Sequence, residues 1–263
     1  MSEKFNFYKI LKTTIEEDES IAVATVVASK TEAQIELGAK LLVFADGKQQ
    51  GSLGNADWDQ KVAKDAVTLL AKEVSKTVSY KFGEVYIESV VPPPPLVIIG
   101  GDADAVPIVT FAKELGFKVV LVDHRPNVAN KEKFPGADDT IVSPVEELSG
   151  NLKINEKTFV LIKTHNYLKD KEILKFVLKA KPRYVGQLGP KARMDDLLKN
   201  LSDEGIAFSK EELSSLYAPV GLDIGAESPE QIALSILTEM LAVKNGRAGG
   251  FLKNQTEAIH PRS

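Results

Sequence analysis

The segment GGDADA, residues 100–105, is the part of this sequence whose residue types most directly suggest chemistry. It follows an apolar run and precedes an amphipathic one, which is where a dinucleotide-binding βαβ unit receives the phosphates of its ligand. In the pattern G-x-G-x-x-G/A the second glycine lets pyrophosphate approach the backbone, whereas here Asp102 follows Gly100 and Gly101. The turn therefore predicts a Rossmann-like unit, and its carboxylate disfavours the usual nucleotide.

Polar residues also follow the other apolar runs in this part of the chain. Asp123 ends the run KVVLVD and would bond a ribose hydroxyl in a nucleotide site, although a turn carboxylate before Arg125 is an equally good interpretation. His165 would act as a general acid or base, as a phosphate donor, or only as a loop histidine. Because the strands of a parallel sheet end at one edge, we expect such residues to line one crevice. The candidates are Gly100, Gly101, Asp102, Asp123, Lys163, His165, Gly189, Lys191 and Arg193.

Three cations, Lys163, Lys191 and Arg193, are the best placed to meet an anionic ligand, and arginine offers a planar fork for phosphate. A hard cation held by Asp102, Asp104 and Asp123 is a weaker alternative, and we predict no metal site. The sequence has no cysteine and no nucleophile elbow, Walker A segment or H-E-x-x-H helix. We therefore assign no catalytic residue and leave open whether the protein is an enzyme.

Composition and charge exclude some classes of protein. The net charge is -4 with both signs interspersed, which gives no basic surface for nucleic acid. No apolar run approaches the roughly 20 residues that cross a bilayer, and the N-terminal 20 residues predict a short amphipathic helix without an apolar signal core. We expect a cytoplasmic protein that binds neither nucleic acid nor membrane.

Strands and helices alternate after residue 95, which predicts a parallel, doubly wound sheet covered on both faces. The expected strands are 96–99, 118–122, 140–142, 158–162 and 183–188, with the first at the centre, and the expected helices are 104–115, 168–180, 190–202 and 229–244. Ser228, Pro229 and Gln231 open the last helix with a capping box and a proline in its first position.

The residues before the prolines predict a smaller, mixed α/β domain. Apolar and β-branched runs at 21–29, 39–45, 77–80 and 84–90 are expected strands, and between them apolar residues recur at helical spacing from Trp58 onward. Four prolines at 92–95 stiffen the chain and predict a linker. We expect an N-terminal domain at 1–91 and a Rossmann-like domain at 96–263.

Several segments together resemble the XdhC/CoxI family, the accessory proteins of molybdenum hydroxylases such as xanthine dehydrogenase. In the first domain these are AVATVV, LGAKLLVFADG and GSLG. In the second domain they are VVLVDHRP, RYVGQLGPKAR and the long segment APVGLDIGAESPEQIALSILTEMLAV followed by GRAGG. The resemblance covers nearly the whole chain, and the long final segment is the most specific.

The resemblance implies a chaperone that binds molybdenum cofactor, protects it during sulfuration by a cysteine desulfurase and passes it to a molybdenum hydroxylase apo-enzyme. It adds Gly51, Ser52, Gly54, Asp57 and Gly186 to the candidate cofactor-binding residues. Asp57 stands where the family usually has a cysteine, so a hard carboxylate replaces a soft thiolate. The alternatives are an NAD(P)-dependent oxidoreductase and a ligand-free interaction module derived from the family. A homodimer is possible.

Overall fold

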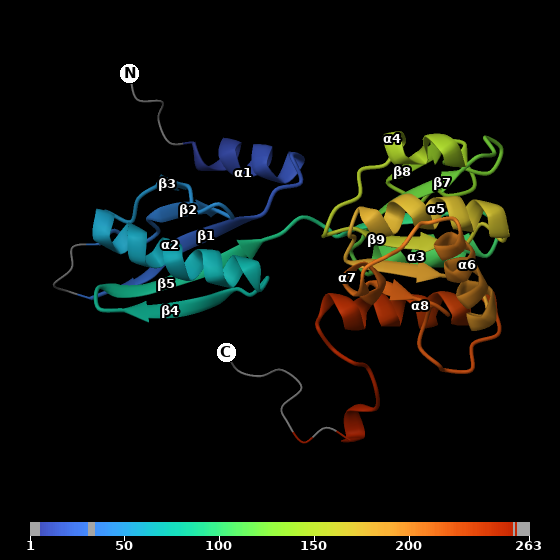
Figure 1. Ribbon diagram of the computed structural model, residues 1–263. Coiled ribbons are helices and arrows are strands. Elements are labelled where there is room, and N and C mark those ends of the chain that lie inside the picture. The colour runs from blue at the N-terminus through green and yellow to red at the C-terminus, as the bar shows by residue number, and fades with distance from the viewer. Residues whose placement is uncertain (1–5, 31–34, 255, 257–263) are drawn as a thin grey trace. The chain divides into compact units, whose positions relative to one another are not determined.

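The protein is described by a computed structural model in which residues 6–30, 35–254 and 256 are placed (Figure 1). The described chain forms two compact units, and the division falls between Pro92 and Pro93, inside the proline run. The strand that opens the second unit already begins at Pro95, which is the last residue of the predicted linker. Each unit has its own hydrophobic core and is described by itself.

The first unit contains a five-stranded antiparallel sheet in the order β3-β2-β1-β5-β4. Its strands are β1 Ile21–Ser29, β2 Lys40–Phe44, β3 Gln49–Gly51, β4 Lys76–Tyr80 and β5 Gly83–Val90. The central strand β1 reads as a continuous apolar run because both of its faces are buried. Ala22 and Ala24 face one core, while Ile21 and Val23 face another on the opposite side.

One helix covers each face of this sheet. Helix α2, Ala56–Ala71, packs its apolar stripe on the Ala22 side, where Trp58 stacks on Phe82 with ring centroids 4.5 Å apart. Helix α1, Phe7–Glu16, contributes Phe7 and two neighbouring apolar side chains to the opposite face. The predicted amphipathic helix and the inward position of Trp58 are therefore both found.

The second unit contains a six-stranded sheet in the order β11-β10-β9-β6-β7-β8, and all of its strand pairs are parallel (Figure 1). The strands are β6 Pro95–Ile99, β7 Lys118–Asp123, β8 Asp139–Val142, β9 Phe159–Ile162, β10 Tyr184–Gln187 and β11 Leu216–Tyr217. This is the predicted Rossmann-like sheet with its first strand in the centre. The chain proceeds from β6 to one edge and then returns to β9, so the topological switch point lies between β6 and β9.

Alternate residues of the buried strands face opposite layers of helices. Leu96 and Ile98 of β6 share a core with α3 Ala105–Glu114 and α8 Pro229–Lys244. Val97 and Ile99 share the other core with α5 Tyr167–Lys179 and α6 Lys191–Asp203. The capping box predicted at the start of α8 is present. The remaining short elements are α4 Leu148–Asn151, α7 Lys210–Ser214, and the 3-10 turns η1 Val145–Glu147 and η2 Leu252–Asn254.

Gly100 allows the ends of β6 and β9 to lie close together at the switch point. Its φ is +115°, and a Cβ atom there would lie 2.4 Å from the carbonyl oxygen of Lys163. Both the backbone conformation and the contact therefore require glycine.

We expect Gly100→Ala to lower the free energy of unfolding by about 3 kcal/mol, because the new methyl group meets backbone atoms that cannot rotate away. Gly116→Ala is the matched control, since Gly116 also has a positive φ but open space around it; it should cost about 1–2 kcal/mol. Urea unfolding followed by circular dichroism measures both. Equal losses in the two variants would contradict the assigned close approach.

Candidate functional site

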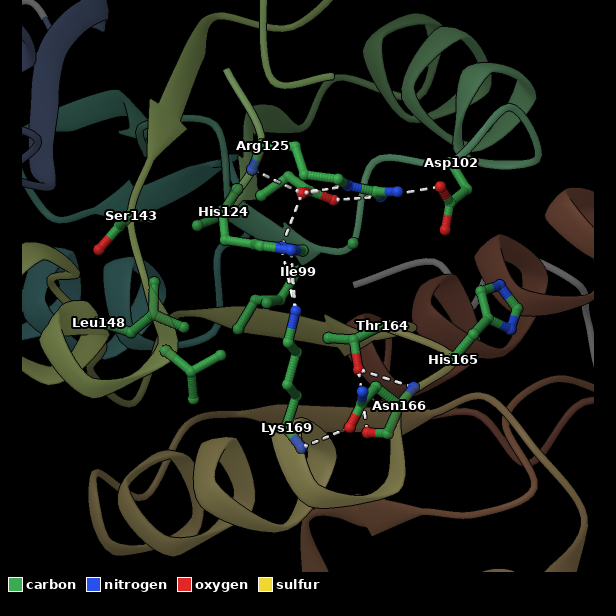
Figure 2. Close-up of a pocket in the computed structure, with 14 residues that line it drawn as sticks. Ile99, Asp102, His124, Arg125, Ser143, Leu148, Thr164, His165, Asn166 and Lys169 are labelled. Carbon is green, nitrogen blue, oxygen red and sulfur yellow. Dashed lines mark hydrogen bonds and ion pairs between the residues drawn. The ribbon is translucent and has the colours of Figure 1, made fainter. Parts of the chain in front are cut away.

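A pocket of about 260 Å³ opens at the carboxyl ends of β6, β7 and β9, beside the switch point (Figure 2). Its floor is apolar and includes Ile99, Val122 and Leu148. Its polar wall is formed by side chains from the residues that follow the strands, which are Asp102, Asp123, His124, Arg125, Ser143, Thr164, His165, Asn166 and Lys169. The pocket thus contains part of the predicted set of strand-end residues, from β6, β7 and β9.

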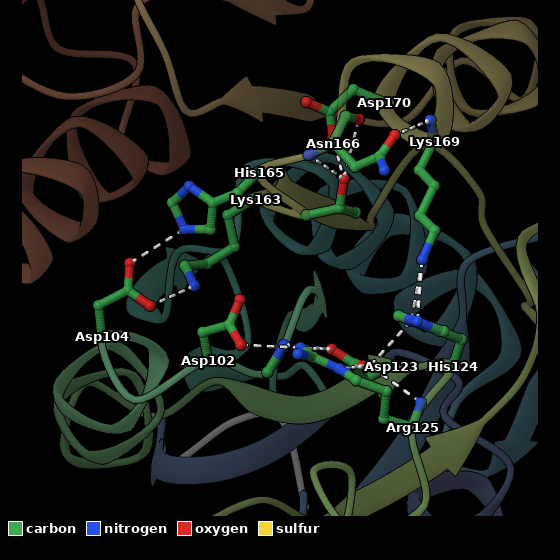
Figure 3. A network of polar contacts seen from close by, with 12 residues as sticks. Asp102, Asp104, Asp123, His124, Arg125, Lys163, His165, Asn166, Lys169 and Asp170 are labelled. Carbon is green, nitrogen blue, oxygen red and sulfur yellow. Dashed lines mark hydrogen bonds and ion pairs between the residues drawn. The ribbon is translucent and has the colours of Figure 1, made fainter.

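Asp123 is the buried centre of the polar wall, with a side chain only 3% exposed. Its Oδ2 atom accepts from the backbone N–H of Gly101 at 2.9 Å and from Arg125 Nη2 at 2.9 Å. Its Oδ1 atom accepts from the backbone N–H and the Nε of Arg125 at 3.0 and 2.9 Å, and lies 3.0 Å from His124 Nδ1 (Figure 3). Both carboxylate oxygens of Asp123 thus accept their hydrogen bonds from groups within the protein.

These contacts determine the ionisation of Asp123. Burial by itself raises the pKa of a carboxyl group, but the hydrogen bonds from Arg125 and Gly101 and the Arg125 charge outweigh it and hold the pKa of Asp123 well below its ordinary value. The same pairing raises the pKa of Arg125. The pair is therefore charged across the whole neutral range.

The carboxylate of Asp102 is paired with a cation, which the sequence alone did not indicate. Arg125 Nη2 donates to Asp102 Oδ1 at 2.8 Å, so one guanidinium bridges the carboxylates of Asp102 and Asp123 (Figure 3). The side chains of Asp102 and Arg125 are 40% and 39% exposed, and both border the pocket. The repulsion that we expected Asp102 to exert on a phosphate is thus partly cancelled by its cation.

Lys169 and His124 meet on the other side of the pocket. Lys169 Nζ lies 2.9 Å from His124 Nε2, and His124 Nδ1 faces Asp123. Lys169 Nζ also lies 3.3 Å from His124 Nδ1, so the ammonium group is close to both ring nitrogens. Lys169 lies in the first turn of α5, whose N-cap Asn166 accepts from the Lys169 N–H.

Lys163 and Asp104 lie beside the pocket, and His165, which lines it, contacts the same Asp104 carboxylate (Figure 3). Lys163 follows β9, its side chain is completely buried, and its Nζ donates to Asp104 Oδ1 at 2.7 Å. His165 has a φ of +54° and places Nε2 3.5 Å from Asp104 Oδ2. Burial raises the pKa of Asp104, but Lys163 and His165 lower it more, and the net shift is downward. Lys163 is thus bound internally and does not line the pocket.

The predicted residues after β10 also lie outside the pocket. Arg193 Nη2 donates to the buried carboxylate of Asp170 at 2.6 Å, and Gln187 and Thr164 bond the same carboxylate. Lys191 is exposed at the start of α6. Gly186 is packed against Val220 and Tyr184, so it serves the fold, and Gly189 has a φ of +135°. Of the three cations expected to meet a phosphate, none reaches the pocket, because Lys163 and Arg193 pair with the carboxylates of Asp104 and Asp170 and Lys191 faces solvent.

The candidate residues of the first unit form the turn that leads into α2. Ser52 Oγ donates to Asp59, whose carboxylate also accepts from the Leu53 N–H. Gly51 and Gly54 have positive φ values of +90° and +103°. Asp57 is exposed in the first turn of α2. This turn belongs to the first unit.

Sequence reasoning missed Lys169, Ser143 and the bridging role of Arg125. Lys169 carried a detectable signal, because a lysine in the first turn of a helix opposes the helix dipole and so suggests a role other than stability. Arg125 was expected after the second strand but was not counted among the cations for phosphate, since the sequence does not show which carboxylate a cation contacts. Ser143 follows a short edge strand and carried no signal.

A parallel sheet with a glycine turn at its switch point defines the second unit as a Rossmann-type ligand-binding domain. Residues 96–240 match the XdhC Rossmann domain, and residues 14–81 match the XdhC and CoxI family. The chain belongs to the XdhC and CoxI family, which confirms the resemblance of its motifs.

Three curated relatives are similar to parts of the chain. It is 32% identical over 160 residues to a probable xanthine dehydrogenase subunit of Bacillus subtilis, covering 61% of this chain and 46% of the relative. It is 31% identical over 234 residues to the "Uncharacterized protein YqeB" of Escherichia coli, covering 81% and 42%. It is 31% identical over 96 residues to the "Molybdenum cofactor insertion chaperone PaoD" of Escherichia coli, covering 36% and 30%. The matches span less than half the length of each relative.

A solved structure resembles the chain over nearly its full length. The crystal structure of a xanthine dehydrogenase from Bacillus halodurans superposes with a TM-score of 0.55 at 25% identity, covering 94% of this chain and 97% of that one. Among the residues placed in the structure, no helix has the length and apolar character of a membrane span. In the same residues, no group of three or more His, Cys, Asp or Glu side chains is arranged to hold a metal ion.

Arg125→Met is expected to lower the free energy of unfolding by about 3 kcal/mol near pH 7, because it leaves the buried Asp123 carboxylate without its cation. In the wild type this contribution is present above about pH 4, the ordinary carboxyl pKa, and is lost as the pH falls below it, because folding lowers the pKa of Asp123. The variant should therefore lose less stability in acid.

Urea unfolding near pH 7 and near pH 3 measures both effects. Arg247→Met, which removes an exposed arginine, is the control. If both variants behaved like the wild type, Asp123 would not depend on Arg125 for its charge.

Proposed function

We propose that the protein is an accessory factor of a molybdenum hydroxylase of the xanthine dehydrogenase type, which binds molybdenum cofactor and assists its sulfuration or insertion. The proposal is supported by family membership and by the similarity to a relative named as a molybdenum cofactor insertion chaperone. The observation that carries it is the open polar pocket at the switch point of the family's Rossmann domain. No residue is assigned a catalytic role.

The pocket fits one end of the cofactor better than the other. Arg125 and Lys169 offer cations to its phosphate, and Thr164 and Asn166 offer polar atoms to the edge of its pterin. The metal end finds no soft ligand, because the chain has no cysteine and the described methionines, Met194 and Met240, are buried. We therefore assign phosphate and pterin recognition to this pocket, and no contact with molybdenum.

The absence of cysteine also restricts the proposed sulfuration. A persulfide is carried on a cysteine sulfur, and this chain has none. Sulfur would thus pass from the cysteine desulfurase to the bound cofactor without forming a persulfide intermediate on the accessory protein. The apo-hydroxylase, the desulfurase and a homodimer remain proposed partners.

The two alternative functions gain no support from the geometry. An NAD(P)-dependent oxidoreductase needs a free acceptor for ribose, and the oxygens of Asp123 are already occupied by Arg125 and Gly101. A ligand-free interaction module would have its crevice filled by side chains, whereas a cavity of about 260 Å³ is present.

Protein isolated anaerobically from cofactor-producing cells should contain pterin and molybdenum. Lys169→Gln should lower the pterin content about tenfold, because a charge-assisted hydrogen bond contributes about 1.5–3 kcal/mol. Lys199→Gln, on the exposed face of α6, is the matched control. Pterin is read by fluorescence after oxidation and molybdenum by mass spectrometry. Pterin-free wild-type protein, or equal contents in the two variants, would contradict the proposal.

Asp57→Cys should raise the amount of molybdenum that stays bound. Residue 57 lies in the first turn of α2, where the helix N-terminus lowers the pKa of a thiol and favours the thiolate that binds soft metals. Lys64→Cys places a thiol on the same helix away from its N-terminus and should have no effect. Molybdenum per protein chain is the measurement. A gain in both variants would indicate nonspecific thiolate binding.

A further inference from the structure

We propose that the pocket of the second unit recognises the phosphate of a phosphomonoester and excludes ribose, and that Asp102 occupies the place of this phosphate on Arg125 until the ligand arrives. The inference deepens the phosphate recognition assigned to this pocket, because it states what the phosphate displaces and which group the site excludes. It rests on the proposed function only for the identity of the group that carries the phosphate.

The guanidinium of Arg125 is held in one orientation. Its Nε and Nη2 both bond the buried Asp123 carboxylate, at 2.9 Å each, so the group cannot rotate without breaking these bonds. Nη2 also donates to Asp102 at 2.8 Å, at the border of the pocket. Arg125 is therefore a preoriented donor for an anion, with one partner that is buried and permanent and one that is exposed.

Asp102 has the properties of a displaceable partner. Its carboxylate is 40% exposed and is held by the bond from Arg125. It also stands in the glycine turn between β6 and α3, where a Rossmann fold receives phosphate. A phosphate carries more charge and more acceptor atoms than a carboxylate, so it can replace Asp102 on the same donor.

Lys169 supplies the second positive group on the opposite side of the pocket. Its position in the first turn of α5 adds the ammonium charge to the positive end of the helix dipole. Its contact with His124 places the ammonium group at the pocket border. Once Asp102 moves away, the pocket wall has two cations and one buried carboxylate, which favours an anion.

The hydrogen bonds that Asp123 already accepts exclude a ribose from this part of the pocket. In a dinucleotide site the acid at the end of the second strand accepts from ribose hydroxyls. Here its two oxygens accept from Arg125 and Gly101, and one of them also faces His124. A ribose would have to displace buried, charge-assisted bonds, whereas a phosphate needs to displace only the exposed bond to Asp102.

Titrations of the labelled full-length protein followed by nuclear magnetic resonance test this proposal. The probes are inorganic phosphate, phenyl phosphate, adenosine and NADH, and the reporters are the Gly101 amide and the Arg125 Nε–H. We expect both phosphates to shift the reporters, phenyl phosphate to bind more tightly because the monoester also contacts the apolar floor, and adenosine and NADH to leave them unchanged.

Asp102→Asn keeps the shape of the side chain and removes its charge, so it should tighten phosphate binding about three- to tenfold. Asp196→Asn makes the same charge change on the exposed face of α6 and should have less than about a twofold effect, since salt screens distant charges. Lys169→Gln should weaken binding about threefold or more.

Four results would overturn the proposal: no shift with either phosphate, equal tightening by Asp102→Asn and Asp196→Asn, micromolar binding of NADH, or equal affinity for the two phosphates, which would indicate a site for free phosphate. The experiments distinguish failure of this inference from failure of the proposed chaperone function. Phosphate binding as expected in a protein that never co-purifies with pterin would leave this inference standing and the chaperone proposal refuted.

Discussion

The arrangement of the site depends on one buried carboxylate and its cation. Asp123 ends β7, and its hydrogen bonds reach the glycine turn after β6 through Gly101 and the following loop through Arg125. The carboxylate therefore joins the ends of two neighbouring strands at the switch point. A carboxylate with so little exposure is stable only when every oxygen is bonded, and this requirement fixes Arg125, which in turn fixes the exposed Asp102.

The large elements of the fold could be predicted from the sequence because each has a periodic apolar pattern that follows from its own burial. The strands β6 and β9 and the middle of β7 are apolar because both of their faces are covered, and α8 carries its own capping box. The elements that escaped prediction, β3, β11, α4 and α7, have two to five residues. Segments of this length owe their conformation to tertiary partners and show no period of their own.

The position of the site could be predicted from the sequence, but the pairing of its charged side chains could not. Strand ends are readable from sequence, so the crevice at β6, β7 and β9 was expected. The choice of partner for each charge is made in three dimensions: Lys163 and Arg193 look like ligand-binding cations in the sequence, yet they neutralise Asp104 and Asp170. The cations that border the pocket, Arg125 and Lys169, came from residues that the sequence presented as a turn and a helix surface.

The family fold and the local chemistry together restrict what this chain can hold. A Rossmann-type sheet provides a turn for phosphate and an acid for ribose, and here the acid is used internally while the turn carries its own carboxylate. In the first unit, the resemblance to the family places the hard carboxylate of Asp57 where a soft cysteine ligand is expected. Under the proposed function, both features disfavour contacts to ribose and to the metal, while Arg125 and Lys169 remain at the pocket for a phosphate. A cofactor held by its phosphate and pterin would keep its metal end exposed, and exposure of the reactive end is what transfer to a second protein requires.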